Sequence, residues 1–284
     1  VKHLVMFVIG GILIYLAIEK QYEPSLLLPI GFGAIISNIP LSSAVGEEGF
    51  LTILYKAGIA TELFPVLIFI GVGAMIDFKP LIASPFMLFF GAAAQFGIFA
   101  TMLFAISTGK FTLPEAASIG IIGAADGPTS IYVAKVFAPN YLGPISVAAY
   151  SYMSLVPIIQ PPVIKLLTTE KERKIRMKYT TVHVPKKVEI LFPIVITVIA
   201  GIIAPMSVAL IGALMFGNLI RVCGVLERLS ISAQNELSNL VTILLGITIG
   251  GTMSADAFLN IHTLMILAMG LVAFIFDTAG GVLF

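Results

Sequence analysis

The stretch GIIGAADGPTS, residues 120–130, places one carboxylate, Asp126, between an apolar run and the helix-breaking pair Gly127 and Pro128. It lies in a chain of 284 residues, of which 58% are hydrophobic and only 11% are charged. A soluble domain carries about 25% charged residues, so this composition excludes a soluble globular protein. It indicates an integral membrane protein, in which an acid inside an apolar segment is a candidate functional site.

Charge and cysteine content exclude two further classes of protein. Sixteen Lys and Arg residues against fifteen Asp and Glu leave a net charge of +1, without the basic surplus of a nucleic-acid-binding protein. The single cysteine, Cys223, excludes a disulfide scaffold and a metal site built from several thiolates.

The apolar segments predict an all-α polytopic membrane protein that forms a single transmembrane domain over residues 1–284. Crossing a bilayer core of about 30 Å takes about 20 apolar residues in a helix. Several candidates are short or interrupted by glycine and proline, as in helices that pack closely or unwind around a site. The nine candidates are 3–18, 24–39, 60–76, 81–106, 143–166, 189–204, 206–222, 236–253 and 261–277.

The basic loop at 165–188 predicts the orientation. Residues 165–187 hold eight of the sixteen basic side chains, and short loops rich in Lys and Arg stay in the cytoplasm. Counting crossings outward from this loop places twelve basic residues inside, provided that residues 113–138 enter and return on the outer side. We therefore expect a re-entrant hairpin near 113–138. If this segment crosses instead, the orientation of everything before it is reversed.

Two segments predict an internal repeat. ELFPVLIFIGVGAMIDF at 62–78 and ELSNLVTILLGITIGGTMSADAF at 236–258 both begin with Glu-Leu and run through glycines to Met, Asp and Phe. Four predicted crossings lie between them, so they point in opposite directions. Inverted repeats of this kind are typical of transporters, whose site lies between the two halves.

The second repeat is expected to be incomplete. The first, 62–138, places Asp126 51 residues after Met75, and the same step from Met253 falls beyond Phe284. We therefore expect a truncated chain in which 236–284 is only the beginning of the second repeat.

Asp126 is the strongest candidate for chemistry, because a carboxylate in hydrocarbon costs several kcal/mol unless it has a partner. The break at Gly123, Gly127 and Pro128 frees backbone carbonyls, and Thr129 or Ser130 adds a hydroxyl. Such hard oxygens suit Na⁺. The alternative is an aspartate in a turn at the mouth of a water-filled loop.

Other polar residues leave two interpretations open. Tyr150 and Tyr152 could relay a proton or simply pack with one hydrogen bond each. Lys135, nine residues after Asp126, could be its counter-ion or could extend outward to the interface. Asp277 could lie in an unwound stretch at a site or be structural.

The remaining acids favour structural positions. The sequence predicts that Asp77 and Asp256 lie in turns. It predicts that Glu62 and Glu115 lie at the outer membrane–water interface.

Five strings together resemble the β subunit of the sodium-pumping biotin-dependent decarboxylases, which act on oxaloacetate, methylmalonyl-CoA or glutaconyl-CoA. The resemblance covers essentially the whole chain, and the GGADGPT-type motif is specific to that family, although Ala124 stands where the family usually has Gly. The strings are GVGAMIDFKPLIASP (71–85), GIIGAADGPTSIYVA (120–134), AAYSYMSLVPIIQPP (148–162), RKIRMKY (173–179) and FDTAGGVLF (276–284).

The resemblance implies a membrane subunit that removes CO₂ from carboxybiotin on a soluble carrier domain, exports Na⁺ and consumes a proton from outside. It implies that Asp126 binds Na⁺ and that a tyrosine among Tyr150 to Tyr152 lies near the site. The family's second ion-binding motif, an Asn-Pro run followed by Gly and Ser, would come after Phe284, so the resemblance implies that residues 1–284 hold only one of the two ion-binding motifs.

The resemblance also implies α (carboxyltransferase and biotin carrier) and γ partners, a homo-oligomer expected to be a trimer, and a place in the prokaryotic plasma membrane. The basic residues Arg173, Lys174, Arg176 and Lys178 could dock the carboxybiotin carrier or the carboxyltransferase. They could equally be no more than the signal that sets orientation.

Two other functions remain open from the sequence. A secondary Na⁺-coupled carrier of an organic anion, with no decarboxylase partner, would use the same repeats and the same acid in a broken helix. A passive scaffold leaves the GAADGP motif unexplained.

Overall fold

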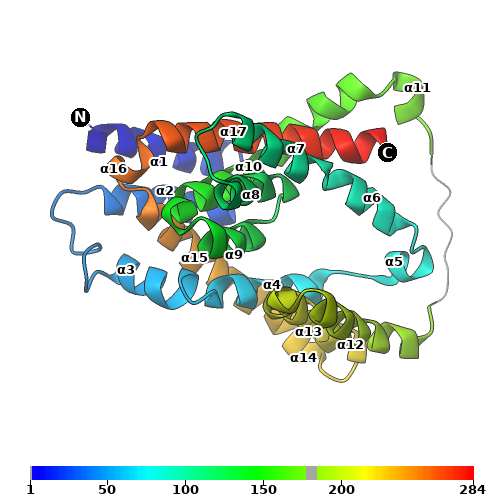
Figure 1. Ribbon diagram of the computed structural model, residues 1–284. Coiled ribbons are helices and arrows are strands. Elements are labelled where there is room, and N and C mark those ends of the chain that lie inside the picture. The colour runs from blue at the N-terminus through cyan, green and yellow to red at the C-terminus, as the bar shows by residue number, and fades with distance from the viewer. Residues whose placement is uncertain (1, 177–183) are drawn as a thin grey trace.

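The computed structural model describes residues 2–176 and 184–284, and within these ranges every regular element is a helix (Figure 1). The all-α class is therefore confirmed. The α-helices are α1 Lys2–Glu19, α2 Pro24–Ser37, α3 Phe50–Leu54, α4 Leu63–Met75, α5 Lys79–Ala83, α6 Met87–Ala94, α7 Phe96–Ser107, α8 Leu113–Gly120, α9 Gly127–Phe137, α10 Leu142–Leu167, α11 Glu170–Arg173, α12 Lys186–Ile203, α13 Val208–Cys223, α14 Glu227–Ser232, α15 Ser238–Thr252, α16 Ala255–Phe258 and α17 Ile261–Leu283.

Short helical turns of other types link these helices. Two are π-helical, η1 Tyr55–Ile59 before α4 and η5 Ala233–Leu237 before α15. Three are 3₁₀ turns: η2 Ile121–Ala124, η3 Pro139–Tyr141 and η4 Pro205–Ser207.

Each of the nine predicted segments contains a helix, but fewer qualify as complete spans. Four helical stretches in the described residues are long and apolar enough to cross a membrane, or up to six if each of two bent pairs is one span. The predicted number of nine is therefore not confirmed. Short helices explain the difference: α2 has 14 residues, which corresponds to about 21 Å of helix, less than a bilayer core.

Glycines bring α2 and α15 into backbone contact. A Cβ atom added to Gly33 of α2 would lie 2.3 Å from the carbonyl oxygen of Ile247, and one added to Gly250 of α15 would lie 2.1 Å from that of Ile30. Each glycine thus faces the carbonyl three residues before the glycine of the other helix. Any side chain here would separate the two helices, so the crossing requires glycine.

The pair α4 and α13 repeats this arrangement. A Cβ on Gly73 would lie 1.8 Å from the carbonyl oxygen of Leu214, and one on Gly217 would lie 1.9 Å from that of Ile70. Small residues at such crossings let membrane helices pack closely where lipid offers no hydrophobic driving force. The helices α2, α4, α13 and α15 therefore form one closely packed group.

A second group consists of α7, α8, α10 and α17. The short helices α8 and α9 lie near the centre of Figure 1. Its buried residues include Ile119 of α8, Ile122 of the turn η2 and Phe274 of α17, all 1% exposed or less. The helix α9 contacts both α10 of this group and α4 of the first group. The segment after Asp126 therefore lies where the two groups meet.

An ion pair joins the start of α12 to the start of α5, the short helix that follows α4. Glu189 of α12 is buried and lies 3.4 Å from Lys79 Nζ and 3.5 Å from Lys186 Nζ. Asp77 accepts a hydrogen bond from the Lys79 backbone N–H at 3.0 Å, which is the turn position that its sequence favours.

Candidate functional site

The helix that begins with α8 breaks directly before Asp126. Ala125 adopts a left-handed conformation with φ of 55°, and α9 then begins at Gly127 with Pro128 in its first turn. Proline suits this position because it lacks the N–H that a helix start leaves without a partner. The two short helices α8 and α9 pack against each other on either side of this break. The re-entrant hairpin near 113–138 stays a prediction.

Asp126 is the N-cap of α9. One carboxylate oxygen, Oδ1, accepts a hydrogen bond from the Thr129 backbone N–H at 3.3 Å, and Oδ2 accepts one from Thr129 Oγ1 at 2.5 Å. The Ser130 hydroxyl donates to the backbone carbonyl of Asp126 at 2.8 Å. The predicted ligands Asp126, Thr129 and Ser130 are therefore brought together. The capping role and the site role are compatible, since a carboxylate has further lone pairs.

Gly123, the fourth predicted ligand, has a different environment. It lies in η2, and a Cβ added to it would meet Ala273 of α17 at 3.1 Å. It allows the chain before the break to approach α17 closely.

A cavity of about 480 Å³ reaches Asp126 from between the two helix groups. Asp126, Pro128 and Tyr150 line one side, and residues of α2, α4, α13 and α15 line the others. Its walls are mostly apolar with a few polar groups, which is the usual composition of a binding pocket.

Tyr150 lies beside the break, whereas Tyr152 faces away from it. Tyr150 is 1% exposed, lines the cavity, and its hydroxyl has no hydrogen-bond partner among the described residues. A Cβ on Gly127 would lie 2.3 Å from Tyr150 Cζ, so glycine allows the ring to rest on the start of α9. Tyr152 donates to the Leu267 carbonyl at 2.5 Å and its ring packs on Phe274.

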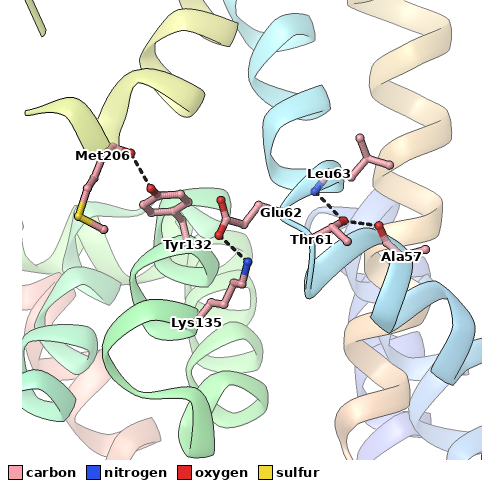
Figure 2. A network of polar contacts seen from close by, with 7 residues as sticks. All are labelled: Ala57, Thr61, Glu62, Leu63, Tyr132, Lys135 and Met206. Atoms are coloured by element: carbon pink, nitrogen blue, oxygen red, sulfur yellow. Dashed lines mark hydrogen bonds and ion pairs between the residues drawn. The ribbon is translucent and has the colours of Figure 1, made fainter. Parts of the chain in front are cut away.

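Polar contacts hold α9 at two points (Figure 2). Lys135 Nζ lies 2.6 Å from Glu62 Oε1, where the chain bends before α4, and the Tyr132 hydroxyl donates to the Met206 carbonyl at 2.5 Å. The idea that Lys135 is the counter-ion of Asp126 is therefore wrong. Nine residues of helix separate Lys135 from Asp126 by about 13 Å along the axis. The carboxylate that pairs with Lys135 is that of Glu62.

Replacing Lys135 by Met should destabilise the subunit by about 1–3 kcal/mol, between the values for exposed and buried ion pairs. The two side chains are 33% and 20% exposed, so Glu62 would be left as a half-buried charge. The thermal unfolding midpoint of the detergent-purified subunit measures the effect. The double variant Glu62→Gln/Lys135→Met should recover part of the loss.

The matched control is Lys2→Met, which breaks the exposed Lys2–Asp256 pair and should change stability little. If the Lys135 and Glu62 effects simply add, the two residues do not act as a pair.

Asp277 is helical, and the unwound stretch suggested by its sequence is wrong. It lies inside α17, which continues to Leu283. A Cβ on Gly97 of α7 would lie 2.3 Å from the Asp277 backbone N, so close packing on α7 supports the helix here. Its Oδ1 is buried without a hydrogen-bond partner among the described residues.

The predicted docking residues lie at the exposed helix α11. Arg173 donates to Thr168 Oγ1 at 3.0 Å and to the Thr168 carbonyl, and Lys174 pairs with Glu170 at 2.5 Å. Arg176 is exposed. Lys178 lies outside the described residues. Docking by this cluster stays a prediction.

The sequence did not single out Glu23 or Thr242, both of which line the cavity. A signal for Glu23 existed in the pair Glu23-Pro24, since an acid directly before a helix-starting proline lies at a helix N-terminus. Thr242 carried no signal, because a threonine in an apolar helix is common.

Comparison with known proteins identifies the family. Residues 2–284 match the family described as Na⁺-transporting oxaloacetate decarboxylase beta subunit. The chain is 54% identical to methylmalonyl-CoA decarboxylase subunit beta of Veillonella parvula, covering 99% of this chain and 74% of that protein. It is 53% identical to glutaconyl-CoA decarboxylase subunit beta of Acidaminococcus fermentans, with 99% and 74% covered, and 45% identical to oxaloacetate decarboxylase beta chain of Klebsiella pneumoniae, with 98% and 78% covered.

These matches agree with the resemblance found in the sequence motifs. They extend over the helix break at Asp126, the cavity and the basic loop. The chain therefore belongs to the family of Na⁺-transporting decarboxylase beta subunits and is a membrane component of a decarboxylase complex.

Proposed function

We propose that this chain couples the decarboxylation of carboxybiotin to the export of Na⁺ across the prokaryotic plasma membrane. The observation that carries the proposal is the carboxylate of Asp126, which lies at a helix break and lines a cavity between two helix groups. Broken helices with a carboxylate and free carbonyls are the ion sites of many transporters.

Na⁺ fits this site better than a divalent cation. Within the described residues, no group of three or more His, Cys, Asp or Glu side chains could hold a metal ion. Divalent cations usually take several carboxylates, whereas one carboxylate with hydroxyl and carbonyl oxygens suits a single positive charge. The ligands proposed are Asp126, Thr129 and Ser130, with the backbone at Gly123.

The chemical step consumes one proton. The C–N bond of carboxybiotin breaks, CO₂ leaves, and the electron pair remaining on the biotin nitrogen takes up the proton. Tyr150 lies beside Asp126 and is the proposed donor near the cavity, while Tyr152 supports the neighbouring helix. Asp126 would be ionised with Na⁺ bound and protonated once Na⁺ has left, which links the ion to the proton.

The proposed orientation places the basic loop 165–188 in the cytoplasm. The other ends of the spanning helices then lie on the outer side of the membrane. Residues assigned to one side contact each other: Lys79 pairs with Glu189 next to the basic loop, and Lys2 pairs with Asp256 on the opposite side. Glu23, an exposed residue that lines the cavity, lies three residues after Lys20, which this orientation places on the cytoplasmic side. The cavity would therefore open toward the cytoplasm.

An inverted repeat is part of the proposal. The reciprocal glycine crossings of α2 with α15 and of α4 with α13 support it, as do the π-helical turns that precede α4 by three residues and α15 directly. In this arrangement 62–138 and 236–284 belong to opposite repeats, and the segment at Asp126 moves relative to the rest.

The proposed partners are an α subunit that carries biotin, a γ subunit and further copies of this chain, expected to form a trimer. Biotin would be delivered by the partner, and Arg173, Lys174 and Arg176 would meet the carrier domain at the cytoplasmic face.

The test is decarboxylation of carboxybiotin by the intact subunit in proteoliposomes, with and without Na⁺. CO₂ release that Na⁺ stimulates, together with Na⁺ movement, would support the pump. Na⁺-coupled uptake of an organic anion without CO₂ release would contradict it and favour a secondary carrier.

A further inference from the structure

The cavity that reaches Asp126 is lined by a second carboxylate. Glu23 stands directly before α2 and is exposed, whereas Asp126 lies deeper, at the helix break. Among the described residues that line the cavity, these two carry the only charges, and both are negative. A low-dielectric cleft with charges of one sign concentrates counter-ions, so this cavity attracts cations.

The local fold does not account for the Glu23 side chain. Its carboxylate makes no capping hydrogen bond to α2, and within residues 2–176 and 184–284 it has no ion pair. Its backbone carbonyl accepts from the Leu26 and Leu27 N–H groups at 3.0 Å, which any residue could do. Ser, Thr, Asp or Asn would cap this helix better than Glu.

The backbone of Glu23 is strained. Its φ of 37° and ψ of 63° lie in the left-handed region, which glycine adopts readily and other residues avoid. Gln21, two residues earlier, is also left-handed, so this strain belongs to the turn between α1 and α2, and that turn places Glu23 at the cavity.

Tyr150 supplies an independent indication that this cavity holds a ligand. It is 1% exposed, lines the same cavity, and its hydroxyl has no partner among the described residues. Buried hydroxyl groups are normally hydrogen-bonded, so an ion or its hydration shell in the cavity would complete the contacts of Tyr150.

We propose that Glu23 is the residue that draws Na⁺ into the cavity, holding it briefly at the mouth before it reaches Asp126. This inference rests on the proposed pump function. Glu23 is a positioning residue for the cation and takes no part in the decarboxylation itself.

The experiment uses the whole decarboxylase complex in proteoliposomes and follows CO₂ release against Na⁺ concentration at low ionic strength. Glu23→Gln should raise the Na⁺ concentration for half-maximal activity about threefold to tenfold, as expected for loss of electrostatic steering. The rate at saturating Na⁺ should stay within about twofold. Choline chloride should reduce the difference between variant and wild type, because salt screens exposed charges.

Glu19→Gln is the matched control. Glu19 is also exposed, lies four residues earlier at the end of α1, and does not line the cavity. An equal shift in both variants would show a general surface effect and overturn the proposal.

Glu23→Gly separates the charge from the backbone. It removes the carboxylate and relieves the left-handed strain, so it should raise the unfolding temperature yet shift the Na⁺ dependence as Glu23→Gln does. Wild-type Na⁺ dependence in both variants would overturn the role of Glu23 while leaving the pump intact. Absence of Na⁺ stimulation in the wild-type complex would instead overturn the pump function itself.

Discussion

Asp126→Asn should abolish Na⁺-stimulated decarboxylation and Na⁺ transport by the intact complex. Removing one partner of a buried charge contact costs about 3–5 kcal/mol, which corresponds to roughly a hundredfold weaker binding or more. The variant is informative because asparagine caps helices about as well as aspartate. It can accept the hydrogen bond from the Thr129 N–H, so α9 should still begin at Gly127. The substitution removes the charge and keeps the cap.

Na⁺ dependence of CO₂ release and the thermal unfolding midpoint should be measured together. An unchanged midpoint with lost Na⁺ activation is the expected result, because the structural role of Asp126 survives in the variant. Asp256→Asn is the control: it also removes one carboxylate, but from an exposed pair with Lys2 outside the cavity. Hydrogen bonding to Lys2 lowers the pKa of Asp256 from its ordinary value, so wild type carries this charge at neutral pH. Asp126→Asn with full Na⁺ activation would show that Asp126 only caps α9.

The sequence predicted the helices well because their signals are local. Apolar runs with glycine and proline at their ends place a helix in each of the nine segments, and Gly127-Pro128 places the break at Asp126. The number of spans could not be predicted in the same way. Whether a 14-residue helix such as α2 crosses the bilayer depends on its tilt and on its close contact with α15.

Apart from Tyr150, the contents of the site were predicted only where neighbours in sequence are neighbours in space. Thr129 and Ser130 contact Asp126 because they lie in the next helical turn. Lys135 lies in the same helix but reaches Glu62, 73 residues away, and no local pattern announces that contact. Glu23 lies 103 residues before Asp126 in the chain, and only the packing of α2 against the other helices brings it to the cavity.

Tyr150→Phe and Tyr152→Phe should have opposite effects on activity and stability. The Tyr150 hydroxyl has no hydrogen-bond partner among the described residues, so Tyr150→Phe removes a buried polar group that makes no hydrogen bond with them. The free energy of unfolding should stay the same or rise by about 1 kcal/mol. Tyr152→Phe removes the donor to the Leu267 carbonyl and should destabilise by about 1 kcal/mol.

Activity should show the opposite order: Tyr150→Phe should lose activity and Tyr152→Phe should keep it. Tyr150 lines the cavity beside Asp126, so loss of its hydroxyl should lower the rate of carboxybiotin decarboxylation about 10²-fold or more, the scale of a positioned proton donor. Tyr152→Phe should retain most of its activity, because its ring packs on Phe274 of α17 and its hydroxyl points to a backbone carbonyl. Rates at saturating Na⁺ and unfolding midpoints of both variants measure this.

A stable Tyr150→Phe with wild-type rate would assign the unpartnered hydroxyl to packing alone. A stable, inactive Tyr150→Phe beside a destabilised, active Tyr152→Phe would identify Tyr150 as the functional tyrosine of the helix, since loss of folding cannot produce that combination.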